Sequence, residues 1–417
     1  MDAFRPLAVR ASIGSIMLST TASLVLTVAL GLQVYDITRN KLDLGWLGLA
    51  EFLPTALLAL VSGALADRFD RRWIVAAGGL LEVGVVAGLL LYSRVENPKV
   101  TPIFLGVVGF GVARALSGPS MRALVPAAVK EARDIPRVVG LSSAAWQIGS
   151  IIGPIIGAFA YKASSTLAYA VALALFAVSS PLVFLVPKAV GVQHIGADGP
   201  AKATLRHALE GLVVIRRSPI LLGAISLDLF AVLFGGAVAL LPAIADERNW
   251  DKGSVGTLRA VGGIGGALVT FILAARPLRR NVGRSLLLAV SVFGVATVVF
   301  GMTHSLLVAA LAIFTLNAGD SVSVFVRSTL VPIVTPPEQQ GRVLAVENVF
   351  VGASNELGAF ESGVAARLLG TTPAVVGGGI ATLAIVFIWW FAFPALRNVD
   401  RFSDVLGRTR HPDSPGH

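Results

Sequence analysis

The chain has 417 residues, of which 55% are apolar, and its 44 glycines raise that share to about 65%. Charged residues make up only 14%, against about 25% in soluble domains, so the composition excludes a soluble globular protein and a disordered one. Cysteine is absent, which excludes a disulfide framework and a thiolate metal site. The net charge is +10, and the positions of the basic residues along the chain decide which kind of partner it indicates.

Apolar stretches follow one another along the chain, each long enough to cross a bilayer as a helix. The first, 11–35, contains no charged residue and exceeds the apolar core of a cleavable signal peptide, so we expect it to be retained as a membrane span. The sequence predicts twelve spans, at 11–35, 45–66, 73–92, 101–125, 138–160, 166–187, 219–244, 254–275, 284–303, 306–331, 343–370 and 372–394.

A break that contains several glycines divides the spans into two sets of six. Its second part, 203–217, is basic and partly amphipathic, which is typical of a helix at a membrane surface. We therefore predict an N-terminal six-helix bundle at 1–188, a cytoplasmic linker with an amphipathic helix at 189–218, a C-terminal six-helix bundle at 219–396 and a cytoplasmic tail at 397–417.

The positive charges are distributed unevenly between the two sides of the membrane. With both termini in the cytoplasm, the cytoplasmic segments together with the span ends that adjoin them hold 23 lysines and arginines, the outer loops counted in the same way hold 8, and 3 lie deeper within the spans. Short cytoplasmic loops carry such an excess. The basic charge therefore indicates orientation and contact with membrane lipids, and it argues against a nucleic-acid partner. The sequence predicts a multi-pass protein of the bacterial inner (plasma) membrane.

The two halves resemble each other in sequence. A shift of 208 residues places Gly45 on Gly253 and Arg71 on Arg279, so the second and eighth spans occupy equivalent positions. Because six spans is an even number, the repeats have the same orientation, as in transporters whose halves are related by an axis along the membrane normal. A cavity between two such halves can open to either side.

Two motifs indicate a family. The segment 63–72 reads GALADRFDRR and matches GxxxDRxxRR, the signature of the loop between spans 2 and 3 in the major facilitator superfamily. The segment 149–157 reads GSIIGPIIG and matches GxxxGPxxG, which is associated with antiporters of that superfamily. The chain thus resembles these transporters, and the stretches 33–36, 114–128 and 355–358 resemble their enterobactin-exporter and macrolide-efflux branch. The resemblance implies twelve transmembrane helices in two pseudo-symmetric six-helix bundles.

The first motif predicts a gate at the cytoplasmic side. A carboxylate at Asp67 can accept hydrogen bonds from the N-terminus of a neighbouring helix, which the resemblance identifies as the span that begins near Val343. Alternatively, the arginines of this motif only set the topology. The predicted gating residues are Gly63, Asp67, Arg68, Arg71, Arg72 and Arg122.

The second motif predicts a smooth helix face. Gly149, Gly153 and Gly157 recur every fourth residue and let another helix approach closely, while Pro154 removes a backbone donor and can kink the helix. Such a face suits a helix that moves against its neighbour, although ordinary packing of small residues gives the same pattern.

Ionisable residues inside the spans predict proton coupling, because charge within a bilayer is costly. The candidates are Glu51, Asp228, Glu356, Glu361 and Arg114, and Glu82 and Asp320 are further acids within spans. The resemblance places the second and eleventh spans together, which would bring Glu51 near Glu356 or Glu361. Structural salt bridges, for example between an acid and Arg259 or between Asp320 and Arg114, are the alternative.

A sequence match near Arg114 bears on the same question. Arg114 and Gly118 partly match LxRxxQGxG, a signature of proton-coupled members, but Ser117 replaces the glutamine. Aromatic and amide groups that could hold an amphipathic substrate are Trp146, Gln147, Asn348 and Asn355, for which core packing is the alternative.

Signatures of enzymes are absent from the sequence. No Gly-Lys pair provides a phosphate-binding lysine, and no HExxH motif provides a metalloprotease site, so we expect no enzyme activity, cofactor or metal. The sequence predicts a monomeric secondary transporter that exports an amphipathic small molecule, such as a drug or siderophore, in exchange for protons by alternating access. An uncoupled transporter of lipid-like or nutrient molecules, and a non-transporting membrane receptor or scaffold, remain as alternatives.

Overall fold

A computed structural model describes the chain except for residues 1–5, 128, 130–133, 187–204 and 406–417. The side chains of residues 6, 59–68, 119, 122–123, 125–127, 136 and 205–209 also lie outside the description. The described part is helical and forms two compact units, one of Met1–Ala201 with Leu241–Ala260, the other of Lys202–Leu240 with Val261–His417. We call them unit 1 and unit 2. The predicted boundaries at 188, 218 and 396 stay expectations, and residues 189–204 and 406–417 of the predicted linker and tail are outside the described part.

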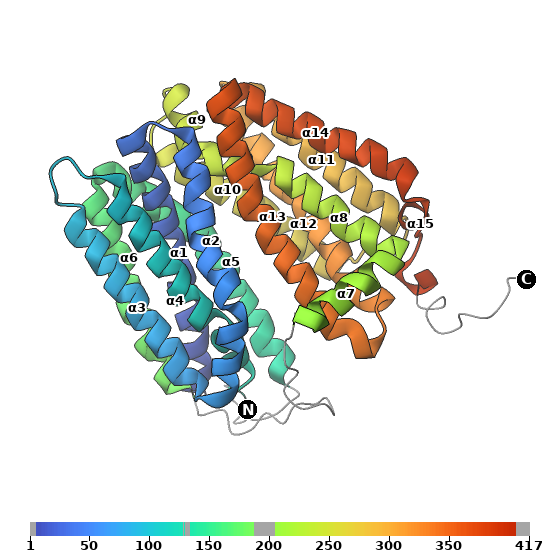
Figure 1. Cartoon of the computed structure of the whole chain (residues 1–417), viewed down its shortest axis with the longest axis horizontal. Coiled ribbons are helices and arrows are strands. Elements are labelled where there is room, and N and C mark those ends of the chain that lie inside the picture. Colours follow the sequence, from blue (N-terminus) through green and yellow to red (C-terminus); the bar gives the residue numbers. More distant parts are fainter. Residues whose placement is uncertain (1–5, 128, 130–133, 187–204, 406–417) are drawn as a thin grey trace, which may run out of the picture. The chain divides into compact units, whose positions relative to one another are not determined.

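Unit 1 contains six long helices in chain order (Figure 1). They are α1 (Pro6–Thr38), α2 (Lys41–Arg68), α3 (Arg71–Tyr92), α4 (Val100–Ala127), α5 (Ile135–Ala163) and α6 (Ser165–Ser179), followed by a 3₁₀ turn, η2 (Pro181–Leu185). The unit also includes α9 (Leu241–Glu247) and the first turns of α10 (Gly253–Ala275). Helix α1 packs against α5, α6, α2 and α4, so it forms the centre of this bundle.

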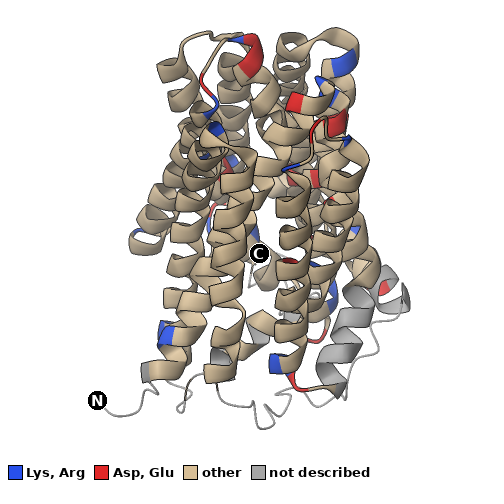
Figure 2. Ribbon diagram, turned by 90° about the vertical axis from the view of Figure 1, so that its left-hand side faces the viewer, with Lys and Arg blue, Asp and Glu red and all other residues tan. Residues whose placement is uncertain are grey.

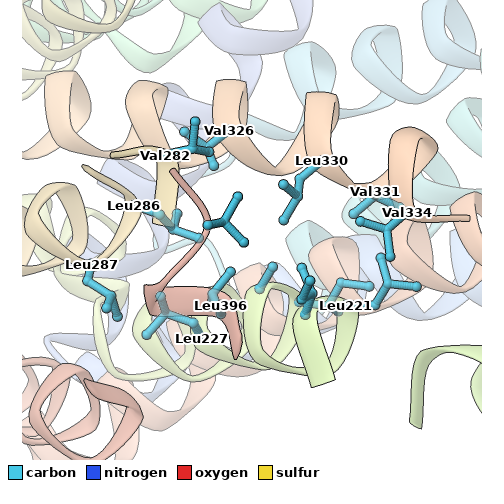
Figure 3. Packing of buried hydrophobic residues seen from close by; sticks show 14 of the residues in the cluster. Leu221, Leu227, Val282, Leu286, Leu287, Val326, Leu330, Val331, Val334 and Leu396 are labelled. Carbon is cyan, nitrogen blue, oxygen red and sulfur yellow. The ribbon is translucent and has the colours of Figure 1, made fainter. Parts of the chain in front are cut away.

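Unit 2 is built around an apolar core (Figure 3). Its elements are α7 (Leu205–Arg217), α8 (Pro219–Phe234), η3 (Gly236–Leu240), the rest of α10, α11 (Val282–Met302), α12 (Leu306–Val334), η4 (Pro337–Gln339), α13 (Gln340–Leu369), α14 (Thr371–Ala392) and α15 (Pro394–Arg397). Leu221 and Leu227 of α8 meet Leu286 of α11, Leu330 of α12 and Leu396 of α15, all buried. The helix α7 covers most of the basic stretch predicted at 203–217.

Local sequence explains where several helices begin. The carboxylate of Asp70 accepts a hydrogen bond from the backbone N–H of Arg72 at 3.0 Å, and the Ser164 hydroxyl accepts one from Leu167 at 3.0 Å. These contacts satisfy backbone donors that the first turn of a helix leaves free. Pro219 occupies the first turn of α8, where its missing N–H costs nothing.

The fold is that of an all-α membrane protein. Ten helical segments of the described chain are long and apolar enough to cross a bilayer, and α2 and α13 lie where the sequence predicts the second and eleventh spans. Many outward-facing side chains are apolar, such as Leu80, Leu307 and Phe387, each at least two-thirds exposed, as hydrocarbon surroundings require. Charged residues gather near the helix ends, with few along the middle (Figure 2).

One predicted span differs from the structure in its continuity. The sequence predicts an unbroken helix over 219–244, whereas α8 ends at Phe234 and is followed by η3 and α9. The adjacent Gly235 and Gly236 explain the break, because Gly236 lies so close to the backbone of Gly358 on α13 that a Cβ atom would collide with it. Glycine also has a low helix propensity, so the close approach and the interruption occur together.

Candidate functional site

A cavity of about 630 Å³ with many hydroxyl groups on its wall lies within unit 1. It is bordered by α1, α3, α4, α5 and the end of α6. The charged residues on its wall are Glu82 from α3 and Arg114 from α4, and Trp146 from α5 adds an aromatic ring. Hydroxyl side chains supply most of the other polar groups, namely Ser15, Ser19, Thr20, Ser23, Ser117, Ser142, Ser143, Ser179 and Ser180.

Glu82 is the buried acid of this cavity. Its side chain comes from the middle of α3 and the residue is only 8% exposed. The Ser117 hydroxyl lies beside its carboxylate and Arg114 acts on it electrostatically, but no basic group of the described residues forms an ion pair with it. Since a buried charge is costly without a partner, Glu82 is the group of the cavity most in need of a proton or a cationic ligand.

Arg114 is held by a second acid. Its guanidinium Nη1 donates to Glu51 Oε1 of α2 at 2.6 Å. The two helices touch here, because Gly111 of α4 lies against the Glu51 carbonyl and the Thr55 hydroxyl donates to the Gly111 carbonyl at 3.1 Å. The structure thus joins two of the predicted coupling residues in one ion pair, and adds Glu82 next to it.

The cavity candidates differ in position. Trp146 lines the cavity and is half exposed. Gln147 is the next residue of α5 and is not on the cavity wall. Asn348 and Asn355 lie on α13 in unit 2, where both are exposed and the Asn355 amide donates to the Val351 carbonyl of its own helix at 2.8 Å.

The glycine face of α5 packs on α1. Cβ atoms at Gly149, Gly153 and Gly157 would fall 2.8–3.0 Å from atoms of α1, in each case including backbone. Pro154 is buried on the same helix, and its carbonyl lies against Gly256 at the beginning of α10. The antiporter-type motif therefore brings α5 close to α1 on one side and to α10 on the other.

The predicted gating residues are only partly described. Arg72 forms an ion pair with Asp70 at 2.8 Å and lies near the Val186 carbonyl, and Arg71 is half-buried at the beginning of α3. Asp70 therefore both caps α3 and neutralises Arg72, a role that the motif does not specify. The side chains of Gly63, Asp67, Arg68 and Arg122 lie outside the described part of the structure.

Unit 2 holds its own buried charge cluster. Asp228 of α8 accepts a hydrogen bond from Arg327 of α12, and the Arg327 Nε lies 3.5 Å from Glu347 of α13. Asp320, two turns before Arg327 on α12, is close enough to affect the same group electrostatically. The candidates Glu356 and Glu361 lie farther along α13, where both are half-buried. Sequence reasoning placed Arg327 within a span but did not name it, or Glu347, as a candidate site residue, although each is a charge within a predicted span.

A second group of charges lies where α1, α2, α5, α9 and α10 meet within unit 1. Four ion pairs join these elements, and we call them the ion-pair cluster. They are Arg39–Asp246 at 2.7 Å, Lys41–Glu247 at 2.5 Å, Lys252–Asp36 at 2.5 Å and Lys162–Asp251 at 2.9 Å. Three of the pairs join the segment 241–260 to α1, to α2 or to Arg39 between them. The pair Lys162–Asp251 joins the segment to α5.

The ion-pair cluster shifts the pKa of two exposed groups. The hydrogen bond and the charge of Asp246 raise the pKa of Arg39. The hydrogen bond from Lys162, followed by the backbone N–H of Gly253 at 2.8 Å, lowers the pKa of Asp251. Both shifts favour the charged forms, so the pairs persist at neutral pH.

Comparison with known proteins identifies the class. The Major Facilitator Superfamily model matches residues 11–359. Enterobactin exporter EntS of Escherichia coli O1:K1 is 25% identical over 326 residues, 76% of each chain, and EntS of Citrobacter koseri is 24% identical over 330 residues, again 76% of each. The protein is thus a transporter and not an enzyme.

Solved structures show the same fold. A bacterial homologue of the lysosomal transporter Spinster, inward-facing and unoccupied, matches with a TM-score of 0.71 at 15% identity, covering 99% of this chain and 100% of that one. The nucleoside transporter NupG matches with a TM-score of 0.69 at 13% identity, covering 93% of this chain and 99% of that one. The chain belongs to the Major Facilitator Superfamily.

Proposed function

We propose that the protein exports an amphipathic small molecule from the cell in exchange for protons. The observation that carries the proposal is the cavity in unit 1, beside which Glu82, Arg114 and Glu51 lie close together inside a largely apolar bundle. Charges held inside a membrane bundle are costly and mark ion or substrate pathways. The similarity to EntS proteins supports export over uptake, because those relatives are named exporters.

Alternating access is the proposed mechanism, with the cavity open to one side of the membrane at a time. The glycine face of α5 on α1 supports it, because a smooth interface allows one helix to slide on another. In this mechanism Asp67 and the arginines of its motif hold the cytoplasmic side closed. At least one of Glu51, Asp228, Glu356 and Glu361 carries the coupling proton. Arg114 balances the charge of Glu51, with which it pairs.

The proposed location is the bacterial cell membrane with both termini in the cytoplasm, as the distribution of 23 and 8 basic residues indicates. The chain has no cysteine of its own, so a single cysteine can be placed at the exposed Arg217 or at the exposed Lys99. Intact cells that express each variant are then treated with a thiol reagent that cannot cross the membrane. We expect labelling at 99 only. Labelling at 217 alone would reverse the orientation.

A substrate screen in an efflux-deficient bacterial host tests the function. Cells that express the protein should resist, or secrete, at least one amphipathic compound from a panel of drugs and siderophores that includes enterobactin, and the effect should disappear with a protonophore. Expression at the membrane without any change in the whole panel would contradict export. Uptake of a compound in its place would favour a nutrient transporter.

A further inference from the structure

Most hydroxyl groups around the cavity of unit 1 can only accept a further hydrogen bond. A serine hydroxyl has one hydrogen to donate and two lone pairs to accept with. Six of the nine hydroxyls on the wall already donate that hydrogen to backbone carbonyls at 2.8–3.3 Å, namely Ser15, Ser19, Ser117, Ser143, Ser179 and Ser180. Their oxygens are therefore left as acceptors.

Ser142 adds an unsatisfied group to this wall. It is only 8% exposed, it lines the cavity, and its hydroxyl oxygen has no hydrogen-bond partner. A buried polar atom without a partner costs free energy. Because this oxygen is itself hardly accessible, the Ser142 side chain must turn toward the cavity for a ligand hydrogen bond to recover that cost.

The charges on the wall point to the same ligand chemistry. Arg114 donates to Glu51 at 2.6 Å, so these two charges balance each other. The carboxylate of Glu82 remains as an excess negative charge, and the one hydrogen of Ser117 cannot serve both Glu82 and the Ala113 carbonyl that it contacts at 3.0 Å. The cavity thus presents many acceptors and an excess negative charge, beside the N–H donors that Arg114 does not use on Glu51. The ring of Trp146 on the same wall can also attract a cation.

We infer that this cavity binds the ammonium group of an organic amine, with Glu82 as its counter-ion and the serine oxygens as acceptors of its N–H groups. The inference rests on the proposed function, because it gives the exported molecule a chemical class: an amphipathic amine with a protonated nitrogen and an apolar remainder that reaches past Trp146. An anionic ligand would instead meet the excess negative charge of Glu82.

A matched pair of fluorescent probes tests the inference on the purified full-length protein. Dansylcadaverine carries a primary ammonium group, whereas its N-acetyl derivative has nearly the same size and no charge. We expect the amine to bind at least about tenfold more tightly, since a charged hydrogen bond and ion pair distinguish the two. Equal affinities, or preference for the acetylated or an anionic dansyl probe, would overturn the inference.

Variants assign the preference to the cavity. Glu82→Gln should remove most of the amine preference and leave binding of the acetylated probe unchanged, while Glu96→Gln, in an exposed loop, should change neither. Ser142→Ala should weaken amine binding by about fivefold, and Ser150→Ala, whose hydroxyl donates to Gln147 outside the cavity wall, should not. If Glu82→Gln does not elute as a folded protein, the comparison of Ser142→Ala with Ser150→Ala and the selectivity of the wild-type protein for the amine still test the inference.

Flux of the same two probes in proteoliposomes separates this inference from the proposed function. Selective binding of the amine without any flux would contradict transport but leave the site standing. Flux of other compounds with no amine preference would contradict the site and leave transport standing.

Discussion

At the residue scale, one arginine lies between two acids in the cavity of unit 1. Arg114 is hydrogen-bonded to Glu51 and acts electrostatically on Glu82. Intramembrane charges could be picked out from the sequence, because every one of them interrupts an apolar stretch. Their pairing could not, since Glu51 and Arg114 are 63 residues apart and meet only because Gly111 lets α2 and α4 touch.

The Arg114→Gln substitution should lower stability, because it removes the counter-ion of Glu51 and leaves two acids close together. We expect a loss of about 1–3 kcal/mol, seen as a lower thermal midpoint in detergent. The double variant Glu51→Gln/Arg114→Gln should recover much of this loss, and Arg94→Gln in an exposed loop serves as the control. Additive losses in the double variant would show that the two residues are not coupled.

The acids of unit 2 should fall into two kinds. Asp228 is buried against Arg327, so Asp228→Asn should destabilise the protein by about 3–5 kcal/mol, because it leaves the arginine buried with a weaker partner. Glu361 has no ion pair with any described basic residue, so Glu361→Gln should fold normally and can lose only transport. Thermal unfolding alongside pH-driven flux checks both, and a stable Asp228→Asn that loses only pH-driven flux would make Asp228 a coupling residue instead.

At the scale of single elements, the glycine face of α5 shows how much a motif can predict. The spacing of Gly149, Gly153 and Gly157 indicated a close helix contact, and the structure has α1 on that face. The identity of the neighbour could not be derived, since any helix with a smooth surface would fit. Likewise, hydropathy located the seventh span, but the close approach of Gly236 to Gly358 that interrupts it depends on tertiary packing.

The Gly153→Ala substitution tests this contact. A Cβ atom there would fall 2.8 Å from the Leu24 Cβ and 2.9 Å from the Thr21 carbonyl oxygen, so the backbone of α1 or α5 must shift. We expect a cost of about 1–3 kcal/mol and reduced transport. Gly140→Ala on the same helix is the control, because nothing lies within 4 Å of its Cβ, and it should be neutral or stabilising by up to about 1 kcal/mol. Equal thermal midpoints for the two variants would contradict the close contact.

At the scale of the whole molecule, one short segment of the second sequence repeat has its contacts in unit 1. The sequence predicted a division near residues 189–218, which separates two sets of six spans. That division stays a prediction, and contacts group the segment 241–260 with unit 1, where the ion-pair cluster joins it to α1, α2 and α5. Ion pairs between residues about 200 positions apart leave no local signal in the sequence, so this grouping was not predictable.

The ion-pair cluster should respond to salt. Its side chains are partly exposed, and 1 M NaCl reduces the screening length to about 3 Å. We therefore expect high salt to speed backbone hydrogen exchange in 241–260 of the wild type, and to have much less effect in an Asp246→Asn/Asp251→Asn variant. Equal salt responses in the two proteins would show that the cluster does not hold the segment.

The pH response of the cluster follows from its pKa shifts. The pKa of Asp251 is lowered, so its stabilising contribution is present above the ordinary carboxyl value of about 3.9 and is lost as the pH falls through the lowered value. The pKa of Arg39 is raised, so its contribution is present throughout the physiological range. The segment should therefore exchange independently of these two groups between about pH 5 and 9, once intrinsic rates are corrected.

The central claim, export driven by protons, is tested most directly by flux in proteoliposomes of the purified protein. With a substrate from the screen present at equal concentration on both sides, an imposed pH gradient should drive its net movement against the proton flow, and nigericin should abolish that movement. Net movement that follows only the substrate's own gradient, unchanged by the imposed pH difference or by nigericin, would contradict proton coupling.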